Sequence, residues 1–155
     1  MESSMEQLLE FITDNWMLVL AFVLILGYWV GAEIYHFSSG VKTITPETAT
    51  QLYNRDNALF VDIRNNTEYR KSHLPGAFHM PSTEVDQLLE KLRRHESRPL
   101  IVYDANGLQA NKTARRLRKA GFETVYQLKT GLTGWESAGY PMERGRTKPK
   151  PNPKG

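Results

Sequence analysis

The feature that most constrains the fold of this chain is an uncharged, apolar stretch from Asn15 to Ala32. In helical conformation these ~18 residues extend over about 27 Å, close to the ~30 Å hydrocarbon thickness of a bilayer. Trp16 lies at one end of the stretch and Tyr28 near the other, where aromatic rings favour the membrane–water interface. We therefore predict one transmembrane helix at about residues 15–32, within an N-terminal segment of residues 1–37.

Two other interpretations of this stretch are weaker. A buried core helix that is apolar on every side needs a larger domain around it. A cleaved signal peptide begins with Lys or Arg and ends at small residues, and this N-terminus has neither feature. A permanent anchor is therefore favoured. Gly27 and Gly31 form a small-xxx-small pattern, which allows two such helices to approach closely, so self-association through the span stays open.

The distribution of charge indicates an orientation. All 20 Lys and Arg residues lie at Lys42 or later, whereas every charged side chain in the flank before the span is acidic. Because Lys and Arg accumulate on the cytoplasmic side, we expect a single-pass protein with its N-terminus outside and its C-terminal domain in the cytoplasm, at the inner membrane if the source is bacterial. The basic body suggests closeness to anionic lipid rather than to nucleic acid, since no aromatic platform is interleaved with its cations.

Strand-like and helical patterns alternate through the rest of the chain. Strands are expected at 58–63, 78–80, 99–103 and 125–128, and helices at 47–54, from Ser82 or Thr83 to 95, at 110–120 and at 132–138. This order predicts an α/β domain, a mainly parallel sheet flanked by helices on both faces. We place a linker at 38–43, the domain at 44–142, and a disordered basic tail, rich in Pro, Gly, Lys and Arg, at 143–155.

The candidate site follows the apolar strand at 99–103. Its loop reads Asp104, Ala105, Asn106, Gly107, Leu108 and Gln109, and a helix comes next. In α/β enzymes such a loop presents a nucleophile beside an anion-binding set of backbone N–H groups. The chain has no Cys, which excludes thiol catalysis, disulfides and thiolate metal sites.

Several motifs together resemble the signature of rhodanese-like domains. That family has Asp-x-Arg, then Glu with an aromatic residue, then Gly-His-Ile-Pro-Gly-Ala. This chain has Asp62-Ile63-Arg64, Glu68-Tyr69, and Ser72-His73-Leu74-Pro75-Gly76-Ala77, and residues 121–122, 125–128 and 131–135 also look like the family's C-terminal half. The resemblance covers residues 42 to 142. It implies a rhodanese-like, doubly wound fold, here preceded by the predicted transmembrane helix.

The resemblance also implies a chemistry that this chain departs from. Rhodaneses carry a sulfane sulfur as a persulfide on a Cys at the start of the loop, and that position is Asp104 here. The Arg that often closes the loop is replaced by Gln109, while Gly107 matches the family's glycine. A carboxylate cannot replace a thiolate, so we expect no sulfurtransferase activity, no catalytic residue and no cofactor. A binding or scaffold role is expected, with another membrane protein or a second copy as partner. The alternative is a sulfurtransferase or sulfur-relay component that relies on a partner's thiol.

Three interpretations of Asp104 remain open. It can be a built-in anion that fills the loop, since a carboxylate accepts hydrogen bonds from backbone N–H groups. It can be a recognition group for a cationic residue of a partner. A nucleophile for phosphoryl transfer is disfavoured, because Asn106 stands where a second Asp is needed to hold Mg²⁺. The candidate binding residues are Asp104, Asn106, Gln109, Lys112, Arg115 and Arg116.

The remaining polar residues of the motifs are assigned to the fold. Asp62, Arg64 and Glu68 are expected to form a buried charge network that supports the loop, and His73 matches a histidine that is usually structural in the family. His73 and His79 have no metal-ligand spacing, so no metal site is expected. The cations of residues 112–119 form either a solvated helix face or a surface for anionic lipid or an acidic partner.

Overall fold

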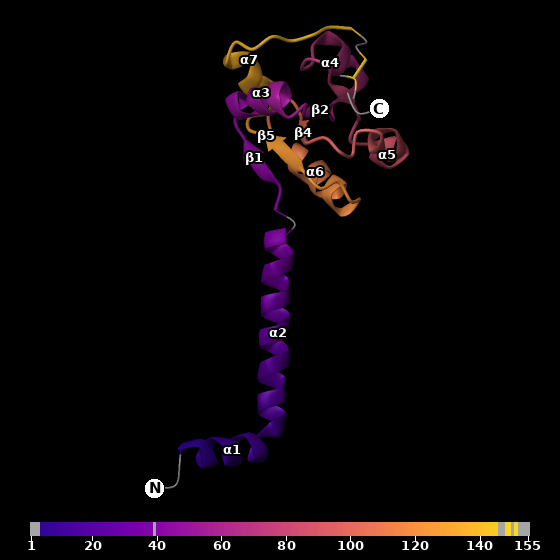
Figure 1. Ribbon diagram of the computed structural model, residues 1–155. Helices are drawn as coiled ribbons and strands as arrows, with labels where there is room; N and C mark the ends of the chain where they lie inside the picture. The colour runs from indigo at the N-terminus through magenta and orange to yellow at the C-terminus, as the bar shows by residue number, and fades with distance from the viewer. Residues whose placement is uncertain (1–3, 39, 146–147, 150, 152–155) are drawn as a thin grey trace. The chain divides into compact units, whose positions relative to one another are not determined.

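The computed structural model describes residues 4–38, 40–145, 148–149 and 151, and the chain divides into two units, Met1–Gly40 and Val41–Gly155. The first unit contains α1 (Ser4–Asp14) and α2 (Trp16–Ser38), which meet at Asn15 (Figure 1). Within the described residues no single helix meets the length and hydropathy criteria for a membrane span. Helix α1 and residues 16–31 meet these criteria only as a pair bent by 90°. The single span at 15–32 therefore stays a prediction.

The second unit alternates strands and helices along the chain. Its elements are β1 (Lys42–Ile44), α3 (Pro46–Arg55), β2 (Leu59–Asp62), α4 (Asn66–Lys71), β3 (Phe78–His79), α5 (Val85–Arg93), β4 (Leu100–Tyr103), α6 (Ala110–Lys119), β5 (Val125–Leu128) and α7 (Gly131–Ser137). Helix α3 begins where the sequence predicts, because Thr45 accepts a hydrogen bond from the Thr48 N–H and Pro46 follows as the first helical residue.

The five strands form one sheet in the order β1-β5-β4-β2-β3, and each neighbouring pair is parallel. Strand β4 lies at the centre, with Val102 opposite Val61 on β2 and Gln127 on β5. The chain thus winds in both directions from the middle of the sheet. The predicted α/β fold with a parallel sheet flanked by helices is confirmed.

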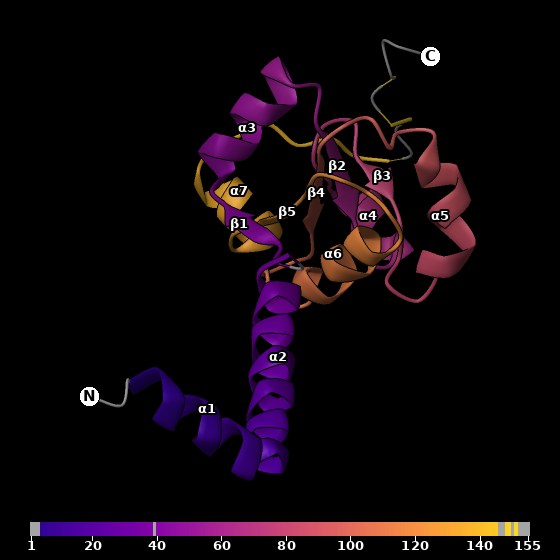
Figure 2. The same cartoon turned by 60° about the horizontal axis from the view of Figure 1, so that its bottom comes forward.

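Each face of the sheet packs against its own helices, as Figure 2 shows with α3 and α7 on one side of the strands and α5 and α6 on the other. Alternation along the strands produces the two cores. Val61 and Val102 point to the α5–α6 side, whereas Phe60 and Ile101 pack with Trp135 of α7. Because both faces are covered, β2 and β4 are buried along their whole length.

The structure corrects several details of the prediction. Strand β1 and helix α4 were not expected, and α1 is a helix separate from α2. Neither Ser82 nor Thr83 caps α5. This helix begins at Val85 after a turn in which the Glu84 N–H donates to the Pro81 carbonyl.

The folded unit also extends beyond both predicted boundaries, 44 and 142. Strand β1 begins at Lys42, and Glu143 exchanges two backbone hydrogen bonds with His73. The Gly145 N–H donates to the Arg70 carbonyl, so the first part of the predicted tail is paired with the domain. Ser39 of the predicted linker and residues 146–147, 150 and 152–155 of the tail lie outside the described residues.

Candidate functional site

The candidate site lies at the carboxyl end of the central strand. Strand β4 ends at Tyr103, the loop runs from Asp104 to Gln109, and α6 begins at Ala110. In parallel α/β sheets this edge is where ligands bind, because loops and helix N-termini converge there. The loop that the sequence singles out therefore has the position of an active-site loop.

The carboxylate of Asp104 points into its own loop. Oδ1 accepts a hydrogen bond from the Gly107 N–H at 2.6 Å, and Oδ2 accepts one from the Gln109 N–H at 2.8 Å. The residue is only 6% exposed. Gln109 immediately precedes α6, so the carboxylate also lies at the positive end of that helix. The loop thus binds an anion supplied by its own first residue.

Strand β5 holds the middle of the loop, at Gly107. The side chain of Gln127 donates to the Gly107 carbonyl at 2.5 Å and accepts from the side chain of Asn111 at 2.9 Å. Gly107 has a φ of +86°, and a Cβ there would lie 2.9 Å from the Thr130 nitrogen. A glycine is therefore required at this position for both conformation and space.

The first turn of α7 holds the beginning of the loop, at Asp104 and Ala105. The Leu132 N–H donates to the Asp104 carbonyl at 2.9 Å, and both the backbone and the hydroxyl of Thr133 donate to the Ala105 carbonyl. Gly131 has a φ of +54°, and a Cβ there would overlap the Asp104 carbonyl oxygen. Gln127, Gly131 and Thr133 are site residues that the sequence interpretation missed, because nothing in their local pattern marks contacts to loop residues 20 to 28 positions earlier.

At the end of the neighbouring strand β2, Asp62 forms a buried ion pair with Arg64. Arg64 donates to both carboxylate oxygens of Asp62, at 3.0 and 2.6 Å, and also to the Ser72 carbonyl at 2.7 Å. Tyr103 donates its hydroxyl to Asp62 at 2.7 Å and accepts from the Leu74 N–H at 3.0 Å. Burial alone lowers the pKa of Arg64, but the hydrogen bond and charge of Asp62, with smaller contributions from the charges of Tyr103 and Glu68, raise it overall. The network fixes the side chain of Tyr103, and Tyr103 is the residue that precedes Asp104 in the chain.

Glu68 does not belong to this buried network, which corrects the prediction. Its side chain is exposed and accepts from the side chain of Asn65 at 2.6 Å. Asn65 in turn caps α4 by accepting from the Glu68 N–H at 2.9 Å. Asn65 is thus the N-cap, and the carboxylate of Glu68 holds the capping side chain in place. The spacing of Asn65 and Glu68 is the signal that could have located α4 in the sequence.

His73 is completely buried and lies in an aromatic stack. The ring of Tyr69 lies between His73 and His79, with centroids 4.0 and 4.2 Å away. His73 Nδ1 contacts the Tyr69 carbonyl oxygen at 2.7 Å, and the Tyr69 hydroxyl donates to the Ala77 carbonyl at 3.1 Å. Burial raises the pKa of Tyr69 to about 12, with smaller contributions from the charges of Asp62 and Glu143. These contacts are those of a structural cluster.

Two hollows adjoin the loop. A polar cleft of about 300 Å³ is lined by Ile63, Arg64, Asn65, Glu68, Ser82, Asp104, Ala105, Asn106 and Gln109. A second hollow of about 410 Å³ is lined by Ser82, Leu108, Gln109, Lys112, Thr113 and Arg116. Within the described part of the chain, no group of three or more His, Asp and Glu side chains could hold a metal ion.

The predicted binding residues are distributed unequally around these hollows. Asp104 and Asn106 line the first, Lys112 and Arg116 line the second, and Gln109 lines both. Arg115 lines neither. Arg116 pairs with Asp86 of α5 at 2.6 Å, which fixes its guanidinium beside the second hollow.

Comparisons with known proteins agree with this architecture. The family model for the rhodanese-like domain matches residues 45–138. The uncharacterized protein YibN of Escherichia coli K12 is 32% identical over 92% of this chain and 100% of its own length. The thiosulfate sulfurtransferase GlpE of Actinobacillus pleuropneumoniae serotype 5b is 35% identical over 64% of this chain and 91% of its own.

A solved structure supports the same assignment. The crystal structure of a thiosulfate sulfurtransferase from Pseudomonas aeruginosa superposes with a TM-score of 0.62 and 26% identity, over 80% of this chain and 23% of that one. The chain has Asp104 where the motif resemblance places the sulfur-carrying Cys, and it has no Cys elsewhere. This chain belongs to the rhodanese-like domain family.

Proposed function

We propose that this protein is a membrane-anchored rhodanese-like binding module without sulfurtransferase activity of its own. The observation that carries the proposal is the pair of hydrogen bonds from Gly107 and Gln109 to the Asp104 carboxylate. A persulfide sulfur is carried on a soft thiolate, and a carboxylate cannot form one. The loop donors that stabilise an anion are here engaged by the protein's own side chain.

The loop surface supports a binding role. Leu108, at the tip of the loop, is 79% exposed, so an apolar side chain is available there for contact with a partner. Beside it lies the hollow that contains the exposed ammonium group of Lys112 and the Asp86-paired guanidinium of Arg116. An apolar residue next to two cations complements a protein partner that presents an acidic side chain beside an apolar one.

The anchor belongs to the same proposal. Residues 15–32 are uncharged, and the Lys and Arg residues all lie at Lys42 or later, which favours an outside N-terminus and a cytoplasmic domain. Gly27 and Gly31 have open space around them, so self-association through α2 is one route to a partner. The other possible partner is a different membrane protein. A reporter fused after Gly155 that is active only outside the cytoplasm would contradict this orientation.

The second candidate function is a sulfurtransferase or sulfur-relay component that works with a thiol supplied by a partner. The observation that favours it is the 35% identity to the thiosulfate sulfurtransferase GlpE. In that case Asp104 and the polar cleft beside it position a donor, and the sulfur is carried elsewhere.

A thiosulfate:cyanide assay on the full-length protein in detergent separates the two candidates. We expect no thiocyanate above the buffer blank, with or without added dithiothreitol or glutathione. Turnover that appears only with an added thiol would support the relay function. Turnover without any thiol would overturn the binding-module proposal.

Site-specific photocrosslinking in native membranes tests the binding surface. A photoreactive residue at Leu108 is expected to capture a partner that the same residue at Glu136, exposed on α7, does not capture. Lys112→Glu should weaken this crosslink because it reverses the charge beside Leu108. Equal capture from both positions would show that the loop is not the binding surface.

A further inference from the structure

Helix α1 has two chemically opposite faces. Helical spacing places Met5, Leu9 and Ile12 on one face, and Glu6, Glu10 and Asp14 on the other. Met5 and Leu9 are 67% and 58% exposed, so in the described structure the apolar face is not covered by protein. A continuous, exposed apolar helix face of this kind requires a protein partner or an apolar medium.

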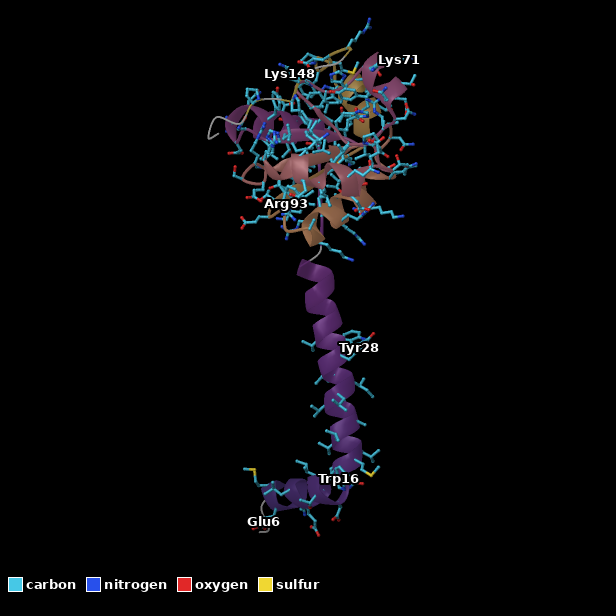
Figure 3. All side chains as sticks on the ribbon, turned by 90° about the vertical axis from the view of Figure 1, so that its right-hand side faces the viewer. Glu6, Trp16, Tyr28, Lys71, Arg93 and Lys148 are labelled. Atoms are coloured by element: carbon cyan, nitrogen blue, oxygen red, sulfur yellow. The ribbon has the colours of Figure 1, made fainter. Side chains whose placement is uncertain are left out.

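The connection to α2 limits what that medium can be. The Asn15 N–H donates to the Phe11 carbonyl at 3.0 Å, and the Val19 N–H donates to the Asn15 carbonyl at 3.0 Å. No loop therefore separates the two helices, although their axes differ in direction by 90°. Figure 3 shows Glu6 on α1 and Trp16 at the bend where α2 begins. Whatever surrounds the first turn of α2 also surrounds the end of α1.

The two helices differ in the environment that they tolerate. Helix α2 is apolar on all sides from Trp16 to Gly31, as a helix within the hydrocarbon core must be. Helix α1 fits neither that core, because of its acidic side chains, nor bulk water, because of its apolar face. A helix parallel to the membrane plane satisfies both faces, and the 90° bend gives this direction if α2 crosses the bilayer.

We infer that α1 lies in the membrane–water interface, with the face of Met5, Leu9 and Ile12 in the acyl boundary and the acidic face in water. The inference rests on the proposed membrane anchoring. The negative charge of α1 distinguishes this helix from the common interfacial helix, which carries Lys and Arg on its polar face. Because α1 has no cation, its insertion relies on apolar burial and does not need anionic lipid.

Spin labels on single cysteines test the position of α1, since the chain has no native Cys. The full-length protein is placed in phosphatidylcholine nanodiscs, and the accessibility of each label to oxygen and to a water-soluble nickel complex is measured. The labelled variants are Met5→Cys and Ile12→Cys on the apolar face, Glu6→Cys and Glu10→Cys on the acidic face, and Phe22→Cys in α2.

We expect the oxygen-to-nickel ratio at Met5 and Ile12 to exceed that at Glu6 and Glu10 by at least about threefold, with Phe22 higher still. Replacing about a third of the lipid with phosphatidylglycerol should not increase this contrast. Equal, water-like ratios at all four α1 positions would overturn the inference, and so would ratios equal to that at Phe22, which would mark a broken span.

Two further outcomes are distinguishable. Strong spin–spin broadening at Ile12 with nickel exclusion would show that a second copy, and not lipid, covers the apolar face, which also overturns the inference. A water-like ratio at Phe22 would show that α2 is not in the bilayer, and the proposed anchoring itself would then fail.

Discussion

Asp104 Oδ1 lies 2.6 Å from the backbone nitrogen of Gly107, so the first residue of the loop supplies the anion that the loop binds. The second carboxylate oxygen engages the Gln109 N–H at the start of α6. The same donors would stabilise a thiolate at this position, since they are backbone groups that do not depend on the side chain of residue 104.

Asp104→Cys should therefore create a reactive thiol. The Gly107 and Gln109 N–H groups and the α6 N-terminus favour the thiolate, and the thiol pKa should fall below the ordinary ~8.5. The pH dependence of alkylation by iodoacetamide gives the thiol pKa independently of how accessible the thiol is, and Asn106→Cys, on the exposed part of the same loop, is the control. A thiol pKa at 104 that is no lower than the one at 106 would show that the loop no longer forms an anion site.

Tyr103→Phe should destabilise the domain by about 2 kcal/mol or more. It leaves the buried Leu74 N–H without its acceptor and removes one donor from the buried Asp62 carboxylate. Denaturant unfolding of the full-length protein in detergent measures the change. Tyr126→Phe, on the neighbouring strand, should cost less than about 0.5 kcal/mol, because that hydroxyl has no hydrogen bond to the described residues. Equal effects would remove the network from the explanation.

Gly131→Ala should cost more than Gly139→Ala. Both glycines have positive φ, +54° and +75°, so both substitutions add backbone strain of about 1 kcal/mol. Only the Cβ at 131 would also overlap the Asp104 carbonyl oxygen, whereas nothing lies within 4 Å of a Cβ at 139. We expect a difference of at least about 1 kcal/mol in the free energy of unfolding. In an Asp104→Cys background, Gly131→Ala should also slow alkylation.

The free energy of unfolding should fall steeply above pH 10. Burial raises the pKa of Tyr69 to about 12, and burial and the charge of Asp62 raise that of Tyr103 well above 10.0. In the unfolded chain both ionise near pH 10, so the unfolded state binds fewer protons above that pH and folding weakens. Each tyrosine contributes a slope of up to about 1.4 kcal/mol per pH unit.

Urea unfolding at pH 8 to 11.5 measures this slope. In Tyr69→Phe the slope above pH 10 should be shallower, since one of the tyrosines whose pKa is raised by the fold is gone. A variant whose slope matches that of the parent would show that the Tyr69 hydroxyl is not protected by the fold.

Much of the fold could be predicted from the sequence because its signals are local. Strand β5 was placed at its observed ends, and β2 and β4 within one residue, since short apolar runs bounded by polar residues mark buried parallel strands. Strand β1 was missed because its three residues are largely exposed and carry no such run. The capping pair of Asn65 and Glu68 is a local signal for the start of α4.

The site could be predicted only in part. Its loop and the change to Asp104 follow from the motif order, but the direction of Glu68 did not. The sequence predicts a buried charge network of Glu68 with Asp62 and Arg64, whereas the carboxylate of Glu68 is exposed and accepts from the side chain of Asn65. The local pair of hydrogen bonds between Asn65 and Glu68 sets that direction, and the order of the motifs does not encode it.

Local sequence patterns are enough to locate β2, β4 and β5 and, approximately, helices α3, α5, α6 and α7, and the absence of Cys alone shows that residue 104 has no sulfur. The contacts that hold the loop form only when the chain is folded. Gln127 reaches Gly107, Thr133 reaches Ala105, and Tyr103 joins Leu74 to Asp62. These contacts arise when parallel strands joined by helical crossovers align their carboxyl ends. They connect residues that are 20 to 41 positions apart, beyond the reach of any local pattern.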